Sequence, residues 1–513
     1  MTDIAGGRTL RSQWNETAHL FPDRVFLKFL SVGDEVTEYT YRQFDGMVKR
    51  AANFFLELGV QKGELVALHL HNSPQYMVCW LALAEIGAVS VPFNEHSSLD
   101  ESRYLLQKCG IGSLILEKAS LPVYEGHFKE LGLRRVISVD CEQEGLLALA
   151  RGTERQPETL REERPLSSDD PAVILFTSGT TRYPKGAVYT HASVIYGGLL
   201  HAQQIGMCSG DRFLSAMPCY HMDFQEMAAM PVICMGGTLI MVEHYSARRF
   251  WRQVCQHRAN FTDTMSVMNR TMLLQPVEPW EKDHCIKQIY FSMGLSLEEL
   301  EAFEERFHVR LLNSYGMTET VSAVTCSPLV GERRWPSVGR PALSYEIKII
   351  HPDGTECAPR EEGEICVRGV PGRSLVSGYY RSPKATARLL PGDGWLHSGD
   401  AGYLDEDGWL YFLGRYGDMI KRSGENISAL EVECVLTSHP DIADAAVIGV
   451  PDAIRDFSVK AFIQLREGAS LTAEDVTDYC SRKLSSFKVP TIIEFVTDFE
   501  RTATGKIIKK HLS

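Results

Sequence analysis

The sequence lacks several features that would place it in a broad class at once. No C-x-x-C pair occurs among its thirteen cysteines, so neither a zinc cluster nor a disulfide framework is indicated, and we expect reduced thiols. Basic residues are not in excess: the net charge is -13, which argues against general binding of nucleic acids. No internal repeat, low-complexity tract or run of coiled-coil heptads is present.

Long apolar runs are also missing. The longest one, residues 77 to 93, is interrupted by Glu85 and by a proline near its end, so it is too short and too broken to cross a membrane. The N-terminal segment lacks the basic-then-apolar order of a secretory signal. We therefore expect a cytoplasmic protein without a membrane span.

What the sequence does contain is enough apolar material for several cores. It has 513 residues, of which 44% are hydrophobic, and single cores rarely exceed about 250 to 300 residues. Residues 64 to 94 and 211 to 242 each predict a strand, a helix and a second strand, which indicates an α/β fold with buried sheets. Short strands between turns predict a β-rich subdomain over residues 340 to 413.

The last hundred residues form a separate pattern of helix, strand, strand, helix and strand, enough for a small α+β core. We place the domain boundary near Gly417. The expected architecture is a large N-terminal domain, residues 1 to 416, with layered α/β subdomains and the β-rich subdomain, followed by a small mobile C-terminal domain, residues 417 to 513.

The segment FTSGTTRYPKG, residues 176 to 186, combines hydroxyl side chains, glycines and a lysine. Backbone N–H groups, hydroxyls and Lys185 could all donate hydrogen bonds to phosphate oxygens. A surface turn has the same composition, however, and the segment is not a Walker A loop, because its lysine follows proline and precedes glycine. From these residues alone, both interpretations stay open.

Further stretches follow in order along the chain: NSYGMTET at 313 to 320, GWLHSGD at 394 to 400 with YFLGRYGDMI at 411 to 420, and TATGKI at 502 to 507. Together with the loop they resemble the signatures of adenylate-forming enzymes, the superfamily of acyl-CoA synthetases, luciferases and peptide-synthetase adenylation domains. The resemblance covers nearly the whole chain. It implies a large α/β domain and a small domain that rotates between two half-reactions.

The resemblance implies that ATP, Mg²⁺ and coenzyme A take part, and it assigns roles to individual residues. Thr318 would contact the α-phosphate, Glu319 would hold Mg²⁺, and Tyr315 would lie against the adenine. Asp400 and Arg415 would hydrogen-bond the ribose hydroxyls. The expected nucleotide-binding set is Thr177, Ser178, Gly179, Thr180, Thr181, Lys185, Asn313, Tyr315, Gly316, Asp400, Arg415 and Gly424.

Two further residues are candidates for catalysis. Lys506 resembles the lysine that bridges the carboxylate and the nucleotide, although a surface lysine in the basic tail KIIKK is the plainer interpretation. His221 resembles a histidine beside the acyl and thioester sites, and its alternative is a buried ring satisfied by a backbone carbonyl. Rotation would bring the loop around Gly424 to the thiol channel, with Gly417 at the hinge position.

Other stretches, among them EHYSARRFW at 243 to 251 and RRWPSVGR at 333 to 340, resemble the bacterial crotonobetaine/carnitine–CoA ligases. Such substrates carry a trimethylammonium group, which Tyr220 and Asp223 could bind through an aromatic face and a carboxylate. The alternative for Asp223 is a cap on a helix beginning at Phe224. Arg182, where glycine is usual, is either an extra cation for pyrophosphate or a solvent-facing side chain.

The predicted function is therefore an ATP-dependent ligase that joins a short betaine-type acid to CoA and releases AMP and pyrophosphate. Its partners would be a small carboxylic acid and CoA, with no nucleic acid, and the sequence does not indicate an oligomeric state. A ligase for medium-chain or aromatic acids is the alternative within this chemistry. A non-catalytic nucleotide-binding protein is the alternative of another class, and it should have lost Lys506, Glu319 or Asp400, all of which are present.

Overall fold

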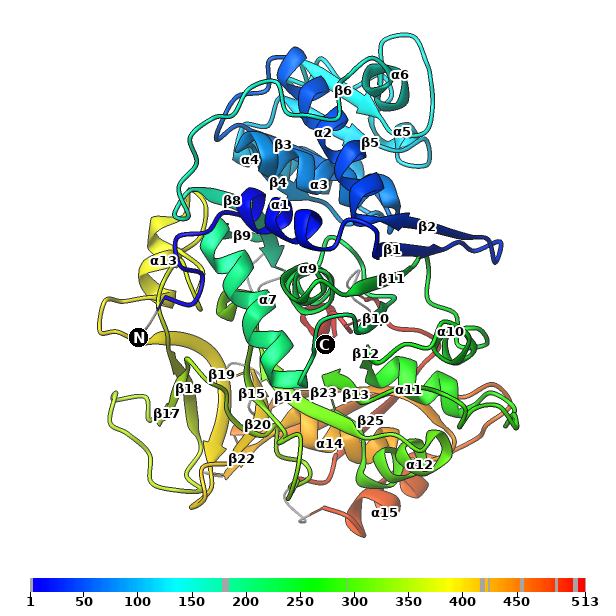
Figure 1. Cartoon of the computed structure of the whole chain (residues 1–513). Helices are drawn as coiled ribbons and strands as arrows, with labels where there is room; N and C mark the ends of the chain where they lie inside the picture. Colours follow the sequence, from blue (N-terminus) through cyan, green and yellow to red (C-terminus); the bar gives the residue numbers. More distant parts are fainter. Residues whose placement is uncertain are drawn as a thin grey trace.

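A computed structural model describes residues 3–177, 184–292, 294–415, 420–422, 425–452, 456–484, 488–501 and 506–512. Within these residues, strands and helices alternate along the first two thirds of the chain (Figure 1). The α/β fold class predicted from the sequence is confirmed. No helix among the described residues is both long enough and apolar enough to span a membrane.

Two mainly parallel sheets form the N-terminal part of the molecule (Figure 1). The seven-stranded sheet has the order β7-β6-β5-β3-β4-β8-β9, and the nine-stranded sheet has the order β16-β15-β14-β13-β12-β10-β11-β1-β2. Strands of the first are β3 Leu65–His69, β4 Val89–Pro92, β5 Ser113–Leu116, β6 Arg135–Ser138, β7 Leu147–Ala148, β8 Pro171–Thr177 and β9 Lys185–Thr190. Strands of the second are β1 Val25–Leu30, β2 Val36–Thr40, β10 Arg212–Ser215, β11 Thr238–Val242, β12 Phe261–Met265, β13 Gln288–Ser292, β14 Leu311–Gly316, β15 Ala323–Cys326 and β16 Arg340–Pro341.

The central strands are apolar because helices cover both faces of a parallel sheet. Strands β3 and β11 are buried at every position. The helices of this part are α1 Leu10–Leu20, α2 Tyr41–Glu57, α3 Pro74–Ile86, α4 Leu99–Cys109, α5 Leu121–Tyr124, α6 Leu149–Glu154, α7 His191–Ile205, α8 Met222–Phe224, η1 Gln225–Ala229, α9 Met230–Met235, α10 Phe250–Gln256, α11 Ser266–Leu273, α12 Leu297–Phe307 and η2 Thr318–Thr320.

Local signals explain where the central helices begin and end. Helix α3 starts at the Ser73 cap, whose hydroxyl accepts from the backbone N–H of Tyr76, and stops at Gly87 in the left-handed conformation. Both strand–helix–strand units predicted from the sequence, at residues 64 to 94 and 211 to 242, are confirmed. In the second unit the helical middle is divided into α8, the π-helical turn η1 and α9.

An antiparallel sheet follows, with the order β17-β18-β19-β20. Its elements are β17 Glu346–Ile350, β18 Gly363–Arg368, β19 Leu396–Leu404 and β20 Leu410–Arg415, with α13 Pro383–Leu389 inserted before β19. The strands therefore fall within the segment where the sequence predicts a β-rich subdomain. The sheet carries the predicted site residues Asp400 and Arg415 on neighbouring strands.

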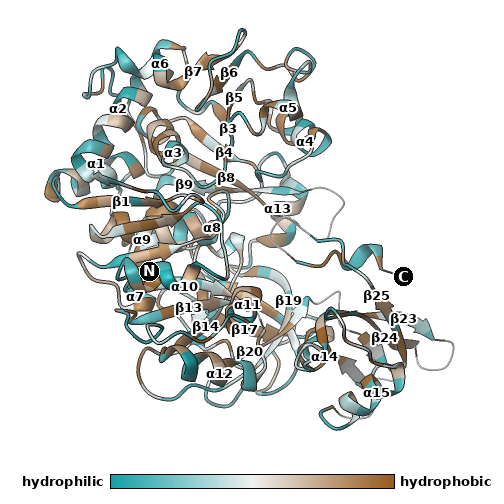
Figure 2. Ribbon diagram, turned by 90° about the vertical axis from the view of Figure 1, so that its right-hand side faces the viewer, coloured by the Kyte–Doolittle hydropathy of each residue, from teal (hydrophilic) through white to brown (hydrophobic). Residues whose placement is uncertain are grey.

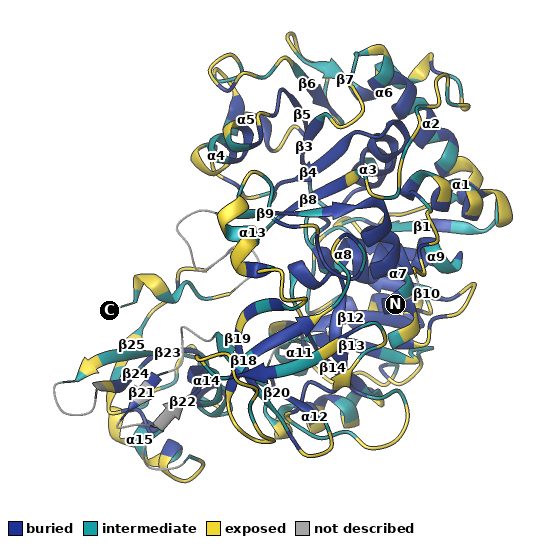
Figure 3. Cartoon of the chain, turned by 90° about the vertical axis from the view of Figure 1, so that its left-hand side faces the viewer, coloured by how far each residue is buried: buried dark blue, intermediate teal, exposed yellow. Residues whose placement is uncertain are grey.

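The C-terminal part has its own sheet and its own apolar core. Its elements are β21 Ile420–Arg422, β22 Glu425–Ile427, α14 Ala429–Thr437, β23 Ile442–Asp452, β24 Asp456–Leu465, α15 Ala473–Ser481, β25 Ile492–Val496 and η4 Lys509–His511. This part lies to one side of the larger body (Figures 2 and 3). Gly417 lies outside the described residues, so the boundary predicted there stays a prediction.

Candidate active site

The phosphate-loop candidate joins two antiparallel strands. Thr177 at the end of β8 pairs in register with Lys185 at the start of β9, and its hydroxyl lies 3.5 Å from the Lys185 carbonyl oxygen. Between them, Ser178, Gly179, Thr180, Thr181 and Arg182 lie outside the described residues. The loop is therefore the closure of a β-hairpin, and the predicted phosphate contacts of these residues stay predictions.

A short segment around Tyr379 pairs with the edge strand β9 of this hairpin. Tyr380 donates its backbone N–H to the Gly186 carbonyl at 2.8 Å, so the segment adds to the edge of β9. As a result, the ammonium of Lys185 lies 5.2 Å from the centroid of the Tyr379 ring, over its face. The Tyr379 hydroxyl donates to Glu319 Oε1 at 2.5 Å. Tyr379 thus links the loop to the NSYGMTET motif, a link that no sequence motif indicated.

Glu319 is held by an unusual turn at the end of β14. It is buried in the short helix η2, and Val321, directly after this helix, has a φ of +64°. The Ser322 N–H donates to the Thr320 carbonyl at 2.6 Å across Val321, which makes a γ-turn with positive φ, a strained conformation for a β-branched residue. Strain of this kind is found where a chain is constrained by function.

The glycine of the same motif is required by close packing. A Cβ on Gly316 would lie 3.0 Å from both Ala323 Cα and the Ser322 carbonyl oxygen. Asn313, on the same strand, is buried and donates from its amide to the Ser337 carbonyl at 2.9 Å. Thr318, half-buried, receives at its backbone carbonyl a hydrogen bond from the Tyr189 hydroxyl. These residues lie on β14 and just after its end, and their contacts with a nucleotide stay predictions.

Asp400 is the centre of a second group of polar side chains. It lies opposite Arg415 in the β19–β20 register, and Arg415 Nη1 is 3.0 Å from Asp400 Oδ1. The Tyr315 hydroxyl donates to Asp400 Oδ2 at 2.7 Å, and the Tyr315 ring stacks on Phe412 at 5.3 Å. Burial raises the pKa of Asp400 above its ordinary value, although Arg415 and Tyr315 oppose this rise. The carboxylate is thus oriented by two donors from different sheets.

Lys506 reaches this group from the C-terminal tail. Its ammonium interacts electrostatically with Asp223, Asp400 and Arg415. Loss of solvent around the ammonium lowers the pKa of Lys506, Arg415 lowers it further, and the two carboxylates act in the opposite direction. The Lys506 side chain is exposed, as expected for a surface lysine of the tail KIIKK, yet it lies within electrostatic reach of Asp400 and Asp223, so its catalytic role stays a prediction.

Two ion pairs anchor the tail that carries Lys506. Arg501 Nη2 lies 2.7 Å from Asp444 Oδ2, and Lys509 Nζ lies 2.7 Å from Glu433 Oε1. Arg501 and Ile507 also form an antiparallel β-bridge. The residues that precede and follow Lys506 are therefore tethered to the C-terminal part.

His221 and Asp223 form a pair at the start of α8. His221 Nδ1 lies 3.2 Å from the Asp223 backbone nitrogen and 3.1 Å from Asp223 Oδ2. The neutral ring can accept the N–H, and the protonated ring can donate to the carboxylate. Burial acts to raise the pKa of Asp223, but His221 and Lys506 outweigh it, and the pKa lies below its ordinary value.

This geometry corrects two alternatives from the sequence. Asp223 is not the cap of a helix beginning at Phe224, because α8 begins at Met222 and its cap is His221. His221 is not a ring satisfied by a backbone carbonyl among the described residues, because its backbone contact there is the N–H of Asp223. The neighbouring Tyr220 is half-buried, and burial raises its pKa.

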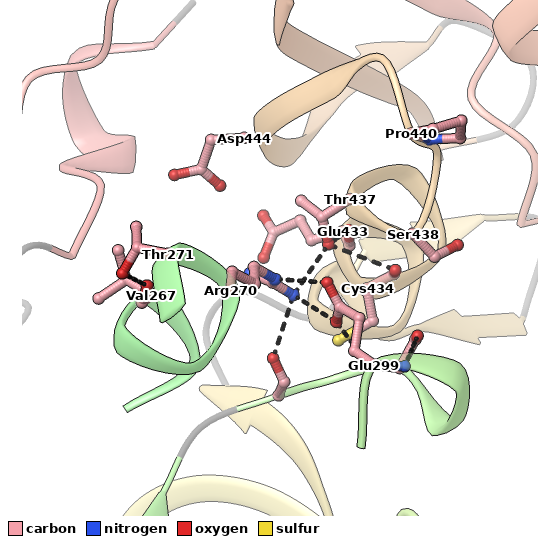
Figure 4. A network of polar contacts seen from close by, with 12 residues as sticks. Val267, Arg270, Thr271, Glu299, Glu433, Cys434, Thr437, Ser438, Pro440 and Asp444 are labelled. Atoms are coloured by element: carbon pink, nitrogen blue, oxygen red, sulfur yellow. Dashed lines mark hydrogen bonds and ion pairs between the residues drawn. The ribbon is translucent and has the colours of Figure 1, made fainter. Parts of the chain in front are cut away.

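Helix α14 of the C-terminal part contacts the N-terminal part through Arg270 of α11 (Figure 4). The Arg270 guanidinium pairs with Glu299 at 2.7 and 3.1 Å, and its Nη2 also lies 3.3 Å from Thr437 Oγ1 of α14. Close by, a Cβ on Gly294 would lie 2.7 Å from the Cys434 sulfur. The two parts are therefore docked at Arg270 and Gly294, in the arrangement that brings Lys506 within electrostatic reach of Asp400.

The donor set fits Mg²⁺ at Glu319. Mg²⁺ in nucleotide sites is bound by one or two carboxylates together with phosphate oxygens and water. Glu319 supplies one buried carboxylate, oriented by Tyr379 and close enough to Asp400 to influence its pKa. Gly424, predicted for the thiol channel, lies outside the described residues.

Comparison with known proteins agrees with this geometry. The family model described as AMP-binding enzyme matches residues 14–380, and the model described as AMP-binding enzyme C-terminal domain matches residues 431–506. The chain is 42% identical over 515 residues to the crotonobetaine/carnitine–CoA ligase of Salmonella paratyphi A, covering 99% of this chain and 100% of that one. It is 41% identical over 516 residues to the enzyme of the same name from Proteus mirabilis, with the same coverage.

Solved structures share the fold. The O-succinylbenzoate coenzyme A synthetase of Bacillus subtilis, in complex with AMP, is 28% identical, with a TM-score of 0.85 over 98% of each chain. The anthranilate CoA ligase AuaEII, in complex with anthranoyl-AMP, is 24% identical, with a TM-score of 0.89 over 98% of this chain and 96% of the other. The overall arrangement of a large α/β part and a small C-terminal part is thus that of these proteins.

Proposed function

Because the chain belongs to the family of AMP-binding enzymes, we propose that it is an ATP-dependent acid–CoA ligase acting on a short betaine-type acid such as crotonobetaine, carnitine or γ-butyrobetaine. One observation carries the proposal: Lys506, from the C-terminal tail, lies within electrostatic reach of Asp400, Arg415 and Asp223 of the N-terminal part. The first half-reaction requires a positive charge beside the residues that would bind the nucleotide, and Lys506 would supply it.

In that half-reaction a substrate carboxylate oxygen bonds to the α-phosphorus of ATP, and the bond to pyrophosphate breaks. Two anions must approach, and at about 4 Å with an effective dielectric near 20 each unit-charge repulsion is worth roughly 4 kcal/mol. Lys506 would lie between carboxylate and α-phosphate, and Lys185 would stabilise the leaving pyrophosphate. Preorganised charges of this kind lower the barrier without reorganising during the reaction.

The same model assigns the nucleotide contacts. Asp400, oriented by Tyr315 and Arg415, would accept hydrogen bonds from the ribose hydroxyls, and Thr318 would donate to the α-phosphate. Glu319 would hold Mg²⁺, which supplies charge neutralisation of the phosphates when bound. Tyr379 keeps the Glu319 carboxylate oriented for that contact.

In the second half-reaction the sulfur of CoA bonds to the acyl carbon, and AMP leaves. We propose that the C-terminal domain, residues 417 to 513, rotates about Gly417, withdraws Lys506 and brings the loop at Gly424 to the thiol. We place His221, whose Nδ1 lies 3.1 Å from Asp223 Oδ2, at the acyl side of the site for this step.

ATP–pyrophosphate exchange with a panel of acids tests the proposal. Exchange that depends on crotonobetaine, carnitine or γ-butyrobetaine, and AMP release that then depends on CoA, are expected. Exchange with medium-chain or aromatic acids but not with betaines would show that the protein is a ligase for medium-chain or aromatic acids. No exchange with any acid, while ATP still binds, would support a non-catalytic nucleotide-binding protein.

A further inference from the structure

One face of the nine-stranded sheet carries a polar group that the proposed mechanism does not use. Asp263 on β12 lies opposite Tyr290 on β13 in the parallel register, so the two side chains share a face. The Tyr290 ring meets His201 of α7 edge-on, with centroids 4.7 Å apart. Asp263 is therefore on the sheet face that α7 covers.

Only one of the two carboxyl oxygens of Asp263 has a hydrogen-bond partner among the described residues. Ser215 Oγ at the end of β10 donates to Asp263 Oδ2 at 2.7 Å. Ser215 Oγ in turn accepts the Met217 N–H at 3.2 Å. Asp263 Oδ1 is buried and has no hydrogen-bond partner among the described residues, and the side chain as a whole is 2% exposed. Leaving a polar atom buried in this way costs about 1 to 3 kcal/mol, more if it is charged.

A second carboxylate lies on the segment that follows β10. Ser215, which donates to Asp263, ends this strand, and the chain then leads to Asp223 in α8. Asp223 also interacts electrostatically with Asp263, with Tyr290 and with Lys506, the lysine that we place at the substrate carboxylate. Asp223 is thus within electrostatic reach of both Lys506 and Asp263.

We propose that Asp263, together with Asp223, binds the cationic end of the acid substrate and makes the enzyme selective for betaines over uncharged acids. The inference rests on the acid–CoA ligase function proposed above. It adds Asp263, a residue in no adenylation motif, as the determinant of charge selectivity.

The chemistry of a quaternary ammonium fits this group. Trimethylammonium cannot donate a hydrogen bond, so it is bound by charge and by aromatic faces. Asp263 and Asp223 supply charge, and Tyr290, which shares the sheet face of Asp263, supplies a ring. A cation beside the two carboxyl groups also allows both to be ionised without net repulsion.

Proton release is a second consequence. Burial raises the pKa of Asp263 to about 8, the Asp223 carboxylate adds to this rise, and the Ser215 hydroxyl opposes it. The group is therefore protonated at pH 7 when no cation is present. A cation beside Oδ1 favours the carboxylate, so binding of a betaine should release a proton.

The first test compares γ-butyrobetaine with 5,5-dimethylhexanoate, in which a tert-butyl group replaces trimethylammonium, by ATP–pyrophosphate exchange. In Asp263→Asn the ratio of kcat/KM for the betaine to that for the neutral acid should fall about tenfold or more. Turnover of the neutral acid should be kept, which shows that the variant is folded. A ratio within about twofold of the unmodified enzyme overturns the inference.

Asp211→Asn is the matched control. Asp211 is a buried carboxylate of the same sheet, just before β10, but both of its oxygens are paired with Lys287 Nζ, at 2.7 and 2.9 Å. Its substitution should leave the ratio unchanged. If the unmodified enzyme itself shows no preference for the betaine, the proposed substrate class is wrong. If that preference exists and survives Asp263→Asn, only the role of Asp263 is wrong.

Calorimetry keeps the inference testable even if Asp263→Asn does not fold. Titration of the intact enzyme with γ-butyrobetaine at pH 7, in buffers of different ionisation enthalpy, should show release of about one proton. The neutral acid should release none. Equal proton release for the two acids overturns the inference.

Discussion

Arg270 Nη2 lies 3.3 Å from Thr437 Oγ1 and joins α11 of the N-terminal part to α14 of the C-terminal part (Figure 4). The same guanidinium is held by Glu299 at 2.7 Å, so the donor is fixed before the C-terminal part docks. The contact therefore favours the arrangement in which Lys506 reaches Asp400 and Asp223.

Thr437→Val should weaken that arrangement without changing the volume of the side chain. A hydrogen bond to a charged donor is worth about 1.5 to 3 kcal/mol, and part of it is replaced by water at the interface. We expect the adenylation half-reaction to slow about five- to tenfold, and transfer from preformed acyl-adenylate to CoA to be unaffected. Single-turnover measurement of each half-reaction checks this.

Ser438→Ala is the control, since Ser438 bonds only within the C-terminal part in the contacts described, to Val435 and Tyr479. Equal slowing of both half-reactions by Thr437→Val would contradict a role of this contact in the adenylation arrangement.

Tyr315→Phe removes the donor to Asp400 and keeps the ring that stacks on Phe412. With one fewer donor, the buried carboxyl of Asp400 should protonate more readily and bind the ribose less well. We expect the KM for ATP to rise about tenfold with a smaller change in kcat. Steady-state kinetics with varied ATP provides the measurement.

Tyr196→Phe serves as a comparison, because its hydroxyl contacts Ser344 at 3.2 Å outside the Asp400 group. A KM for ATP that changes equally in both variants would show that the Tyr315 hydroxyl has no particular role at the nucleotide.

Lys506→Ala should slow adenylation by about 10² to 10³, because it removes a preorganised charge. Acyl transfer from added acyl-adenylate to CoA should persist. Since the pKa of Lys506 is lowered, the ammonium is lost at a lower pH than for an ordinary lysine, and adenylation should decline on the alkaline side earlier than an unperturbed lysine would allow.

Lys510→Ala, in the same tail and likewise exposed, should behave like the unmodified enzyme. Loss of both half-reactions in Lys506→Ala would be inconsistent with a lysine that acts in one step only.

Asp263→Asn should also change the pH dependence of stability. The pKa of Asp263 is about 8 in the folded protein and lower in the unfolded chain, so between these values the folded state holds the extra proton. The contribution of Asp263 to the free energy of unfolding is complete below its pKa in the unfolded chain. This contribution is lost as the pH rises through the pKa in the folded protein, by up to about 1.4 kcal/mol per pH unit. An asparagine does not titrate, so the variant shows no such loss.

The free energy of unfolding of Asp263→Asn, relative to the unmodified protein, should therefore rise between pH 5 and pH 8. Denaturant titrations at several pH values measure it. A difference independent of pH would mean that Asp263 is not buried in its neutral form.

Local patterns in the sequence predicted much of the fold and part of the site. The segment from Glu64 to Asn94 has the apolar strands, the Ser-Pro start and the Gly87 stop that define a strand–helix–strand unit, and these signals act within a few residues. The motifs around Tyr315 and Asp400 indicated residues that the fold brings to a 2.7 Å contact.

The remaining contacts depend on packing between distant segments. Tyr379 and Glu319 are 60 residues apart, and Arg270 and Thr437 are 167 apart, so no local spacing indicates them. Asp263 stands in a short strand, FTDTM, where one carboxyl looks ordinary until its burial and its unfilled oxygen are known. The sequence left a capping role for Asp223 open because Asp is a common capping residue, whereas in the structure His221 occupies the cap of α8.

The central claim is tested most directly by CoA-dependent AMP formation with crotonobetaine and with its neutral isostere (E)-5,5-dimethylhex-2-enoate. The two acids have the same shape and differ in one positive charge. The account predicts AMP formation with crotonobetaine and a kcat/KM that exceeds that of the isostere by about 10² or more. Equal values for the two acids, or no CoA-dependent AMP formation with crotonobetaine, would contradict it.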